Sequence, residues 1–358
     1  MARIFNFNAG PGALPEEVLA EAQRELLDFK GTGMSVMEGS HRAKPYAAVH
    51  DEAVANYRKL LNCSDDYAVL FLPGGASMQF AMLPLNLLAA GRTADYINSG
   101  AWATKAIKEA QRVGQVNIVA DTAAAHPARL PSPAELKFTP DAAYVHITSN
   151  ETIAGTQWKT FPRTAAPLVA DMSSDILSRP LDIRQFGAVY AGAQKNLGPS
   201  GIALLVIRKD LTEHVPDNLP VMLRYQTHIK ENSLYNTPPT FSIYLMMLVS
   251  RWLLKQGLET VYRRNREKAD IIYNVIDATE FYRGTAAPEY RSDMNITFRL
   301  PTEELEERFA KEAAGQGMSG LRGHRSVGGI RASIYNAMPL KGVQSLAEFM
   351  REFAHKHG

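Results

Sequence analysis

The sequence Tyr190-Ala-Gly-Ala-Gln-Lys195-Asn-Leu-Gly-Pro-Ser-Gly-Ile-Ala203 places a single lysine between two apolar runs. The first run ends in Val189-Tyr190, and the second extends from Ile202 to Ile207. Such uncharged runs are typical of buried strands, and the Gly/Pro/Ser residues between them predict a turn. A lysine there is costly to bury unless its amine has a partner or a chemical task. A desolvated amine has a lowered pKa and can form a Schiff base with a carbonyl, which is one such task.

An acidic residue ends a further apolar run upstream, Pro167-Leu-Val-Ala-Asp171-Met-Ser-Ser174. In open α/β sheets, ligands lie outside the carboxyl ends of the strands. Taken alone, Asp171 would also suit a helix N-cap, and Lys195 a solvated loop. Together they suit pyridoxal phosphate (PLP), because a lysine holds its aldehyde as an imine and a carboxylate keeps its pyridine nitrogen protonated. We therefore predict Lys195 and Asp171 as catalytic residues.

The order of the predicted elements indicates an α/β fold, because strands and helices alternate up to about residue 210. We expect a mainly parallel, seven-stranded-type sheet with helices on both faces, and a smaller α+β domain beyond it. Predicted strands cover residues 67–72, 94–98, 116–120, 144–148, 168–170, 188–190, 202–207, 295–300 and 329–335. Predicted helices cover residues 15–30, 50–61, 77–88, 101–113, 242–255, 258–278, 302–314 and 343–356.

The changes in this order also predict the domains. Residues 1–15 are expected to join the small domain or a dimer contact, residues 16–260 to form the large cofactor-binding domain, and residues 261–358 to form the small domain. Residues 121–141 and 210–236 are predicted to be irregular. The Met246-Met247 pair is predicted to be part of the core.

Composition excludes several classes of protein. The 358 residues are 46% hydrophobic and 21% charged, as in ordinary globular proteins, and the net charge of +2 gives no reason to expect nucleic acid or an anionic membrane as partner. Cys63 is the single cysteine, so an intrachain disulfide and a cysteine-based zinc cluster are excluded, and we expect no metal. The start of the sequence is too polar for a signal peptide, and no apolar run is long enough to span a membrane. We expect a cytoplasmic protein.

Two more segments, Asn6-Phe-Asn-Ala-Gly-Pro-Gly12 and Gly39-Ser-His-Arg-Ala-Lys-Pro-Tyr46, complete a recognisable pattern. With the Lys195 segment and the Asp171 strand, they resemble the phosphoserine aminotransferases, a family of class V aminotransferases within the fold-type I PLP enzymes. The resemblance extends from about residue 4 to the C-terminus. It departs at Ala9, where many relatives carry a serine, so a hydroxyl contact to substrate is expected to be missing.

A phosphate site is predicted at Pro73-Gly-Gly-Ala-Ser77, which leaves a strand and opens a helix. Such a turn aims backbone N–H groups and a positive dipole end at an anion. Neither a dinucleotide fingerprint nor a P-loop motif is present. The resemblance implies that Ala76 and Ser77 hold the cofactor phosphate and that the amide of Gln194 donates to it.

Other cofactor contacts are also implied by the resemblance. Trp102 would stack on the pyridine ring, although it would also suit simple packing. Thr152 would donate to the phenolic oxygen, although it would also suit a turn. Asn236 and Thr237 would complete the phosphate cup of the other subunit, which implies a homodimer.

The substrate site is predicted from arginine and histidine residues. A carboxylate is best held by a guanidinium, and Arg331 lies in an apolar predicted strand where an unpaired cation would be costly. The pairs His41-Arg42 and His324-Arg325 would each suit a solvated loop, but together they suit a phosphorylated substrate. The resemblance places all of these residues around substrate, with Arg331 on the α-carboxylate and Arg42 also contacting the glutamate side chain.

The resemblance implies reversible transfer of an amino group between O-phospho-L-serine and 2-oxoglutarate, giving 3-phosphooxypyruvate and L-glutamate in L-serine biosynthesis. A second substrate would be 4-phosphooxy-L-threonine, in pyridoxine biosynthesis. The alternatives are another class V aminotransferase, a cysteine desulfurase-like lyase and a non-catalytic protein of this fold. A desulfurase needs a nucleophilic cysteine on a mobile loop near the small domain, whereas Cys63 follows an early helix. A Schiff-base aldolase on a (β/α)8 barrel would need about eight strand–helix units, which the last third of the chain does not supply.

Overall fold

The computed structural model describes residues 3–213, 215 and 218–358. Met1 and Ala2 of the predicted N-terminal segment, and residues 214, 216 and 217 of the predicted irregular stretch, lie outside the described residues. Seven strands of the described residues form the central sheet, in the order β2 (Tyr67–Pro73), β10 (Ile202–Arg208), β9 (Ala188–Gly192), β8 (Leu168–Asp171), β5 (Val145–Thr148), β3 (Thr93–Asn98) and β4 (Gln115–Asp121).

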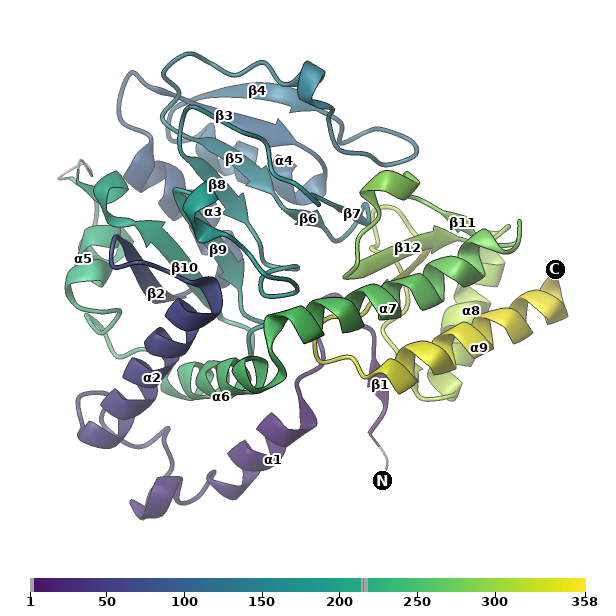
Figure 1. Ribbon diagram of the computed structural model, residues 1–358, viewed down its shortest axis with the longest axis horizontal. Helices are drawn as coiled ribbons and strands as arrows, with labels where there is room; N and C mark the ends of the chain where they lie inside the picture. Colours follow the sequence, from purple (N-terminus) through teal and green to yellow (C-terminus); the bar gives the residue numbers. More distant parts are fainter. Residues whose placement is uncertain (1–2, 214, 216–217) are drawn as a thin grey trace.

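Strand β10 runs antiparallel to both of its neighbours, and the remaining neighbours in this sheet are parallel. The prediction of an α/β fold with a mainly parallel sheet is therefore confirmed (Figure 1).

Both faces of the sheet are buried, which explains the uninterrupted apolar runs in the sequence. In β2, for example, Val69 and Phe71 belong to one apolar cluster, whereas Leu70 and Leu72 belong to the cluster on the opposite face. The helices of the first cluster are α1 (Glu16–Arg24), α2 (Lys44–Leu61) and α6 (Thr240–Gln256). Those of the second are α3 (Gly75–Leu87), α4 (Ala101–Ala110) and the short α5 (Tyr225–Lys230).

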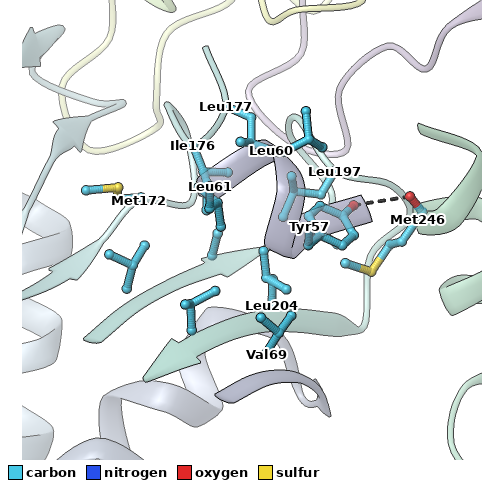
Figure 2. Close-up of a cluster of buried hydrophobic side chains, with 14 of the residues drawn as sticks. Tyr57, Leu60, Leu61, Val69, Met172, Ile176, Leu177, Leu197, Leu204 and Met246 are labelled. Atoms are coloured by element: carbon cyan, nitrogen blue, oxygen red, sulfur yellow. Dashed lines mark hydrogen bonds between the residues drawn. The ribbon is translucent and has the colours of Figure 1, made fainter. Parts of the chain in front are cut away.

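The first cluster extends to the loops that follow β8 and β9 (Figure 2). Met172 follows directly after β8, and Leu197 belongs to the loop after β9; both are buried in this cluster. The hydroxyl of Tyr57 on α2 donates to the carbonyl of Met246 on α6 at 3.2 Å. Met246 and Met247 are both fully buried, which confirms their prediction as core residues. The core thus anchors the ends of the strands that carry Asp171 and Lys195.

A second, smaller body of structure follows α6, and we call residues 258–358 the C-terminal unit. Its three-stranded antiparallel sheet has the order β11 (Arg283–Gly284), β12 (Asn295–Arg299) and β14 (Ile330–Ser333). Its helices are α7 (Leu258–Asp277), α8 (Glu303–Gly315) and α9 (Leu340–His357), and Figure 1 shows α7 extending from the large sheet region into this unit. Near the N-terminus, β1 (Phe5–Asn6) pairs in parallel with β13 (Met318–Ser319), and Phe7 lies in the same apolar cluster as α7, α8 and α9.

The remaining elements are short: a hairpin, which lies beside the candidate site, and several turns of 3-10 helix. Strands β6 (Asn150–Glu151) and β7 (Thr156–Gln157) pair as an antiparallel hairpin after β5. Single turns of 3-10 helix cover Phe29–Gly31, Pro133–Glu135, Ile183–Gln185, Lys209–Thr212, Val221–Leu223 and Pro288–Tyr290.

The three largest differences from the predicted elements concern α1, α2 and α5. The predicted helix over residues 15–30 is wrong beyond Arg24, because Leu26 and Leu27 are exposed and offer no buried face to continue it. Helix α2 begins at Lys44 rather than residue 50, since Pro45 suits a first helical turn. The predicted irregular stretch 210–236 contains α5, which buries Tyr225 and His228. Among the described residues, no helix is long and apolar enough to cross a membrane.

Candidate active site

The carboxyl ends of β2, β3, β5, β8 and β9 all lie at one edge of the central sheet, as parallel strands require. A cavity of about 380 Å³ opens at this edge. It is lined by Ala9, Gly10, Gly74, Gly75, Ala76, Ser77, Phe80, Trp102, Thr152, Asp171, Ser173, Gln194, Lys195, Gly201, His324 and Arg331. Residues from at least seven separate stretches of chain therefore meet here.

Lys195 and Asp171 both line this cavity, in the loop after β9 and at the last position of β8. Burial lowers the pKa of Lys195, and the nearby carboxylates of Asp171 and Glu151 oppose that shift. Among the described residues, no hydrogen bond fixes the Lys195 amine, whose Nζ lies 5.5 Å from the centroid of the Trp102 ring. An accessible amine with a lowered pKa is suited to attack a carbonyl.

Asp171 is held by one neighbouring residue. Its Oδ1 accepts hydrogen bonds from Ser173 N at 2.9 Å and from Ser173 Oγ at 2.6 Å. Burial raises the pKa of Asp171, and the charge of Lys195 together with the Ser173 hydrogen bonds opposes this. Within the described chain no hydrogen bond reaches Oδ2, so the second oxygen of the carboxylate remains available to a ligand.

Trp102 and Thr152 lie together on the wall of the cavity. The indole Nε1 of Trp102 donates to Thr152 Oγ1 at 2.7 Å. Because this bond uses a lone pair of the hydroxyl, Thr152 keeps its proton for donation to another acceptor. The ring of Trp102 lies in the first turn of α4, immediately after β3.

The N-terminus of α3 forms another part of the cavity. Gly74 and Gly75 have φ of 90° and 63°, a left-handed conformation that favours glycine, and the turn leads directly into α3. The side chain of Gln194 lies nearby, and its buried Oε1 has no hydrogen-bond partner in the described chain. A Cβ at Gly192 would lie 2.8 Å from that oxygen and 3.4 Å from Ala76 N. An open space thus lies at the positive end of α3, beside the side chain of Gln194.

Arg331 and His324 of the C-terminal unit both reach the cavity. Arg331, on β14, donates from Nη1 to the Thr152 carbonyl at 3.3 Å, and its buried Nε has no partner in the described chain. Burial lowers the pKa of Arg331. Burial also lowers the pKa of His324, as do the nearby cations Arg331, Lys105 and Arg325. A region with several cations is expected to attract an anionic ligand.

Comparisons with known proteins agree with this geometry. The family model described as Aminotransferase class-V matches residues 4–346. A phosphoserine aminotransferase from Herpetosiphon aurantiacus is 56% identical over 99% of both chains, and one from Geobacillus kaustophilus is 55% identical over the same shares. The solved phosphoserine aminotransferase from Bacillus circulans subsp. alkalophilus superposes with a TM-score of 0.97, at 54% identity over 99% of both chains. The chain belongs to the phosphoserine aminotransferase family.

Membership of this family confirms the prediction of a PLP-dependent aminotransferase with a type I fold. The cofactor is PLP, and the cavity suits its parts. Lys195 has an amine that could react with the aldehyde, and Asp171 Oδ2 could accept from the ring nitrogen. The N-terminus of α3 could hold the phosphate. The described residues contain no group of three or more His, Cys, Asp or Glu placed to hold a metal ion.

The structure brings together nine of the predicted site residues and leaves five apart. Those lining the cavity are Ala76, Ser77, Trp102, Thr152, Asp171, Gln194, Lys195, His324 and Arg331. Those outside its lining are His41, Arg42, Asn236, Thr237 and Arg325, of which Arg42, Thr237 and Arg325 are exposed. Ala9 lines the cavity, and its carbonyl accepts from Tyr335 Oη at 2.6 Å.

Sequence reasoning missed two residues of the site. One is Ser173, which follows Asp171 by two positions and binds its Oδ1 through both the backbone N–H and the hydroxyl. Glu151 stands next to Thr152, and its fully buried carboxylate binds the start of α4. A glutamate beside a polar loop gives no sign of burial in the sequence, so only its charge in a Thr-Ser-Asn-Glu-Thr stretch was available as a signal.

Proposed function

We propose that the protein transfers the amino group of O-phospho-L-serine to 2-oxoglutarate, reversibly, giving 3-phosphooxypyruvate and L-glutamate. The observation that carries this proposal is the meeting of Lys195 and Asp171 with His324 and Arg331 around one cavity. Relatives that carry the name phosphoserine aminotransferase support it. We include 4-phosphooxy-L-threonine as a second substrate, and we place the reaction in L-serine and pyridoxine biosynthesis in the cytoplasm.

In this proposal, the residues of the sheet edge carry the chemistry. PLP supplies, when bound, a ring that withdraws the electrons of the bond broken at the α-carbon of the amino acid. Asp171 holds a proton on the ring nitrogen, and its burial beside Lys195 keeps that interaction out of water. Lys195, with its lowered pKa, takes the proton from the α-carbon and returns it to the cofactor. Thr152 donates its free hydroxyl proton to the phenolic oxygen, and the Trp102 ring stacks on the pyridine face.

The phosphate of the cofactor is proposed to lie at the N-terminus of α3, held by Ala76, Ser77 and Gln194. The positive end of the helix dipole supports this location. Gln194 lines the same cavity, and its side-chain NH2 group can donate to an anion there. A phosphate there offers acceptors to these donors.

Substrate recognition is assigned to the cationic residues. Arg331 binds the α-carboxylate, since its guanidinium reaches the cavity and retains an unpaired N–H. His324 and Arg325 bind the substrate phosphate, together with His41 and Arg42, and Arg42 also contacts the side chain of glutamate. His41 and Arg42 lie outside the lining of the cavity in their own chain, so in this proposal they act from a second copy.

We propose a homodimer as the active unit, in which Asn236 and Thr237 complete the phosphate cup of the other subunit. Exposed apolar side chains support it: Tyr235, next to Asn236, is 45% exposed, and Met78, near the start of α3, is 41% exposed. The segment before His41 also exposes Leu27, at 85%, and Met37, at 53%.

The proposed division of the chain into residues 1–15, 16–260 and 261–358 is supported by the packing. Phe7 belongs to the apolar cluster of the C-terminal unit, and β1 pairs with β13 there. The cavity receives Lys195 from the large sheet and Arg331 from the C-terminal unit. Substrate would therefore bind between the two domains.

A desulfurase-like lyase is the alternative that the structure disfavours most directly. Burial raises the pKa of Cys63 to about 11, and Cys63 is absent from the lining of the cavity. A thiol with a raised pKa is a poor nucleophile at neutral pH. Another class V aminotransferase remains the second candidate, and substrate choice separates it from the proposal.

The test is a substrate panel with the double variant His324→Ala/Arg325→Ala. We expect kcat/KM for phosphoserine to fall by about 10²–10⁴-fold, because two side chains are removed and hydrogen bonds to charged groups contribute about 1.5–3 kcal/mol each. Turnover of an unphosphorylated amino acid should change by less than about threefold. The readout is initial rate with 2-oxoglutarate as acceptor. Equal losses for both substrates would refute the assignment of the phosphate site.

A further inference from the structure

Glu151 is a buried carboxylate that the proposed chemistry does not use. It is 0% exposed, and it receives two backbone N–H groups from the first turn of α4. Ala103 N donates to Oε1 at 2.9 Å and Trp102 N donates to Oε2 at 3.2 Å. A carboxylate at a helix N-terminus satisfies donors that have no partner within the helix and interacts favourably with the helix dipole.

Glu151 and its neighbour Thr152 both bind Trp102, one at the backbone and the other at the indole ring. The carboxylate binds the backbone of Trp102, and Thr152 Oγ1 accepts from the indole Nε1 at 2.7 Å. Both come from the hairpin of β6 and β7, where Glu151 is paired with Thr156. The Glu151 carbonyl also accepts from Gly155 N at 2.8 Å. A rigid hairpin therefore determines where the ring of Trp102 lies.

Gly100, just before α4, leaves room for this carboxylate. Its φ of 164° and ψ of −164° are extended, a conformation that any residue adopts. A Cβ at this position would nevertheless lie 2.6 Å from Glu151 Cδ and 2.8 Å from Oε2. The obstacle to a side chain at position 100 is thus Glu151 itself rather than the backbone.

We propose that Glu151 is a positioning residue for Trp102: by binding the backbone of Trp102, it places the indole ring where it can stack on PLP. The absence of a side chain at Gly100 leaves the space that the carboxylate of Glu151 occupies. This inference rests on the proposed stacking role of Trp102. It assigns Glu151 no contact with substrate. The competing explanation is that Glu151 only stabilises α4, as any N-terminal cap would.

The test compares Glu151→Ala, Glu151→Gln and Gly100→Ala with the double variant Gly100→Ala/Glu151→Ala. PLP is titrated into each apoprotein by absorbance, and quenching of Trp102 fluorescence by PLP is obtained from the difference between each protein and its Trp102→Phe counterpart. Thr302→Ala is the matched control, because Thr302 caps the distant α8 by accepting from Leu305 N at 3.2 Å. Removing that cap should lower the melting temperature without changing PLP binding.

We expect Glu151→Ala and Gly100→Ala each to weaken PLP binding by about tenfold and to reduce the Trp102 quenching. Glu151→Gln should recover part of the loss, since one amide oxygen still accepts a hydrogen bond. In the Glu151→Ala background, Gly100→Ala should cost little further, because the clashing side chain is gone.

Two results would overturn the proposal. One is a Glu151→Ala protein that melts lower, like Thr302→Ala, but binds PLP and quenches as the wild type does. The other is a Gly100→Ala loss that is the same with and without Glu151. Both readouts concern cofactor binding alone, so they are independent of whether phosphoserine is the substrate; that is decided by turnover of the wild-type protein.

Discussion

Two lysines of this protein are buried in ways that lead to opposite outcomes. Burial lowers the pKa of both Lys195 and Lys268, the latter to about 7. Lys268, on α7, is fully buried, and its Nζ donates to the carbonyls of Ile334 at 2.8 Å, Tyr335 at 2.7 Å and Met338 at 3.3 Å. Lys195 has no such fixed acceptors in the described chain and opens on a cavity. Burial therefore makes a lysine reactive only where its amine remains free and accessible.

The largest expected effect concerns Lys195, which we expect to bind PLP covalently, whereas Lys268 does not. The purified protein should be yellow, and Lys195→Ala should lose the chromophore that borohydride traps covalently. Its rate should fall by at least about 10²–10⁴-fold, the range for a lost acid–base group. Absorbance, mass after reduction and turnover are the measurements. Lys105→Ala, which removes an exposed amine 4.1 Å from the Trp102 ring, is the control and should keep the chromophore. A colourless wild type that PLP does not restore would refute the enzyme proposal.

The second effect distinguishes Lys268 from Lys195 by its contribution to the stability of the folded protein. Lys268→Met should lower the free energy of unfolding by about 3 kcal/mol, because three buried carbonyls lose their donor. The folded protein should keep its turnover within a few-fold, and it should still bind PLP covalently. Denaturant unfolding provides the measurement. Lys255→Met is the control: Lys255 pairs with Glu17 at 2.9 Å on the surface, and such pairs contribute about 0–1 kcal/mol. Equal small losses in both variants would mean that Lys268 has no anchoring role.

Per pH unit, the smallest expected effect is a pH dependence of stability that arises from Lys268. Its pKa is about 7 when folded and about 10.5 when unfolded, so between these values the unfolded chain holds the extra proton. Stability should therefore rise with pH from about 7 to about 10.5, by up to ~1.4 kcal/mol per pH unit, and it should not change from this group below pH 7. The measurement is the free energy of unfolding of the wild type minus that of Lys268→Met at several pH values. A difference that is flat across this window would show that the three carbonyls keep the ammonium charged.

The two lysines also differ in how well their environments could be predicted from the sequence. Lys195 was recognisable because apolar runs flank it and Asp171 ends a neighbouring run. Lys268 lies in Arg263-Arg264-Asn-Arg-Glu-Lys268, where its neighbours predict a solvated helix face. The carbonyls that surround it are more than 60 residues away along the chain. No local sequence pattern around Lys268 indicates hydrogen-bond partners at that distance along the chain.

Some element boundaries and contacts could not be predicted for the same reason, because they depend on residues far away along the chain. Residues 15–30 have an amphipathic pattern, yet the helix ends at Arg24, because Leu26 and Leu27 are exposed and offer no buried face to continue it. Glu151 has an ordinary polar setting in the sequence, and its burial depends on the space above Gly100 at the start of another element. Propensity and periodicity describe a segment, whereas burial depends on its neighbours.

The sequence by itself determined the sheet, its two covered faces and the pair Lys195 and Asp171, because strand patterns and residues at strand ends are local properties. Tertiary structure alone decided that His324 and Arg331 of the C-terminal unit meet Lys195 while His41, Arg42, Asn236 and Thr237 stay outside the same cavity. It also decided which lysine is sealed by carbonyls and which stays open. These outcomes follow from how distant segments pack, and packing is a property of the whole folded chain.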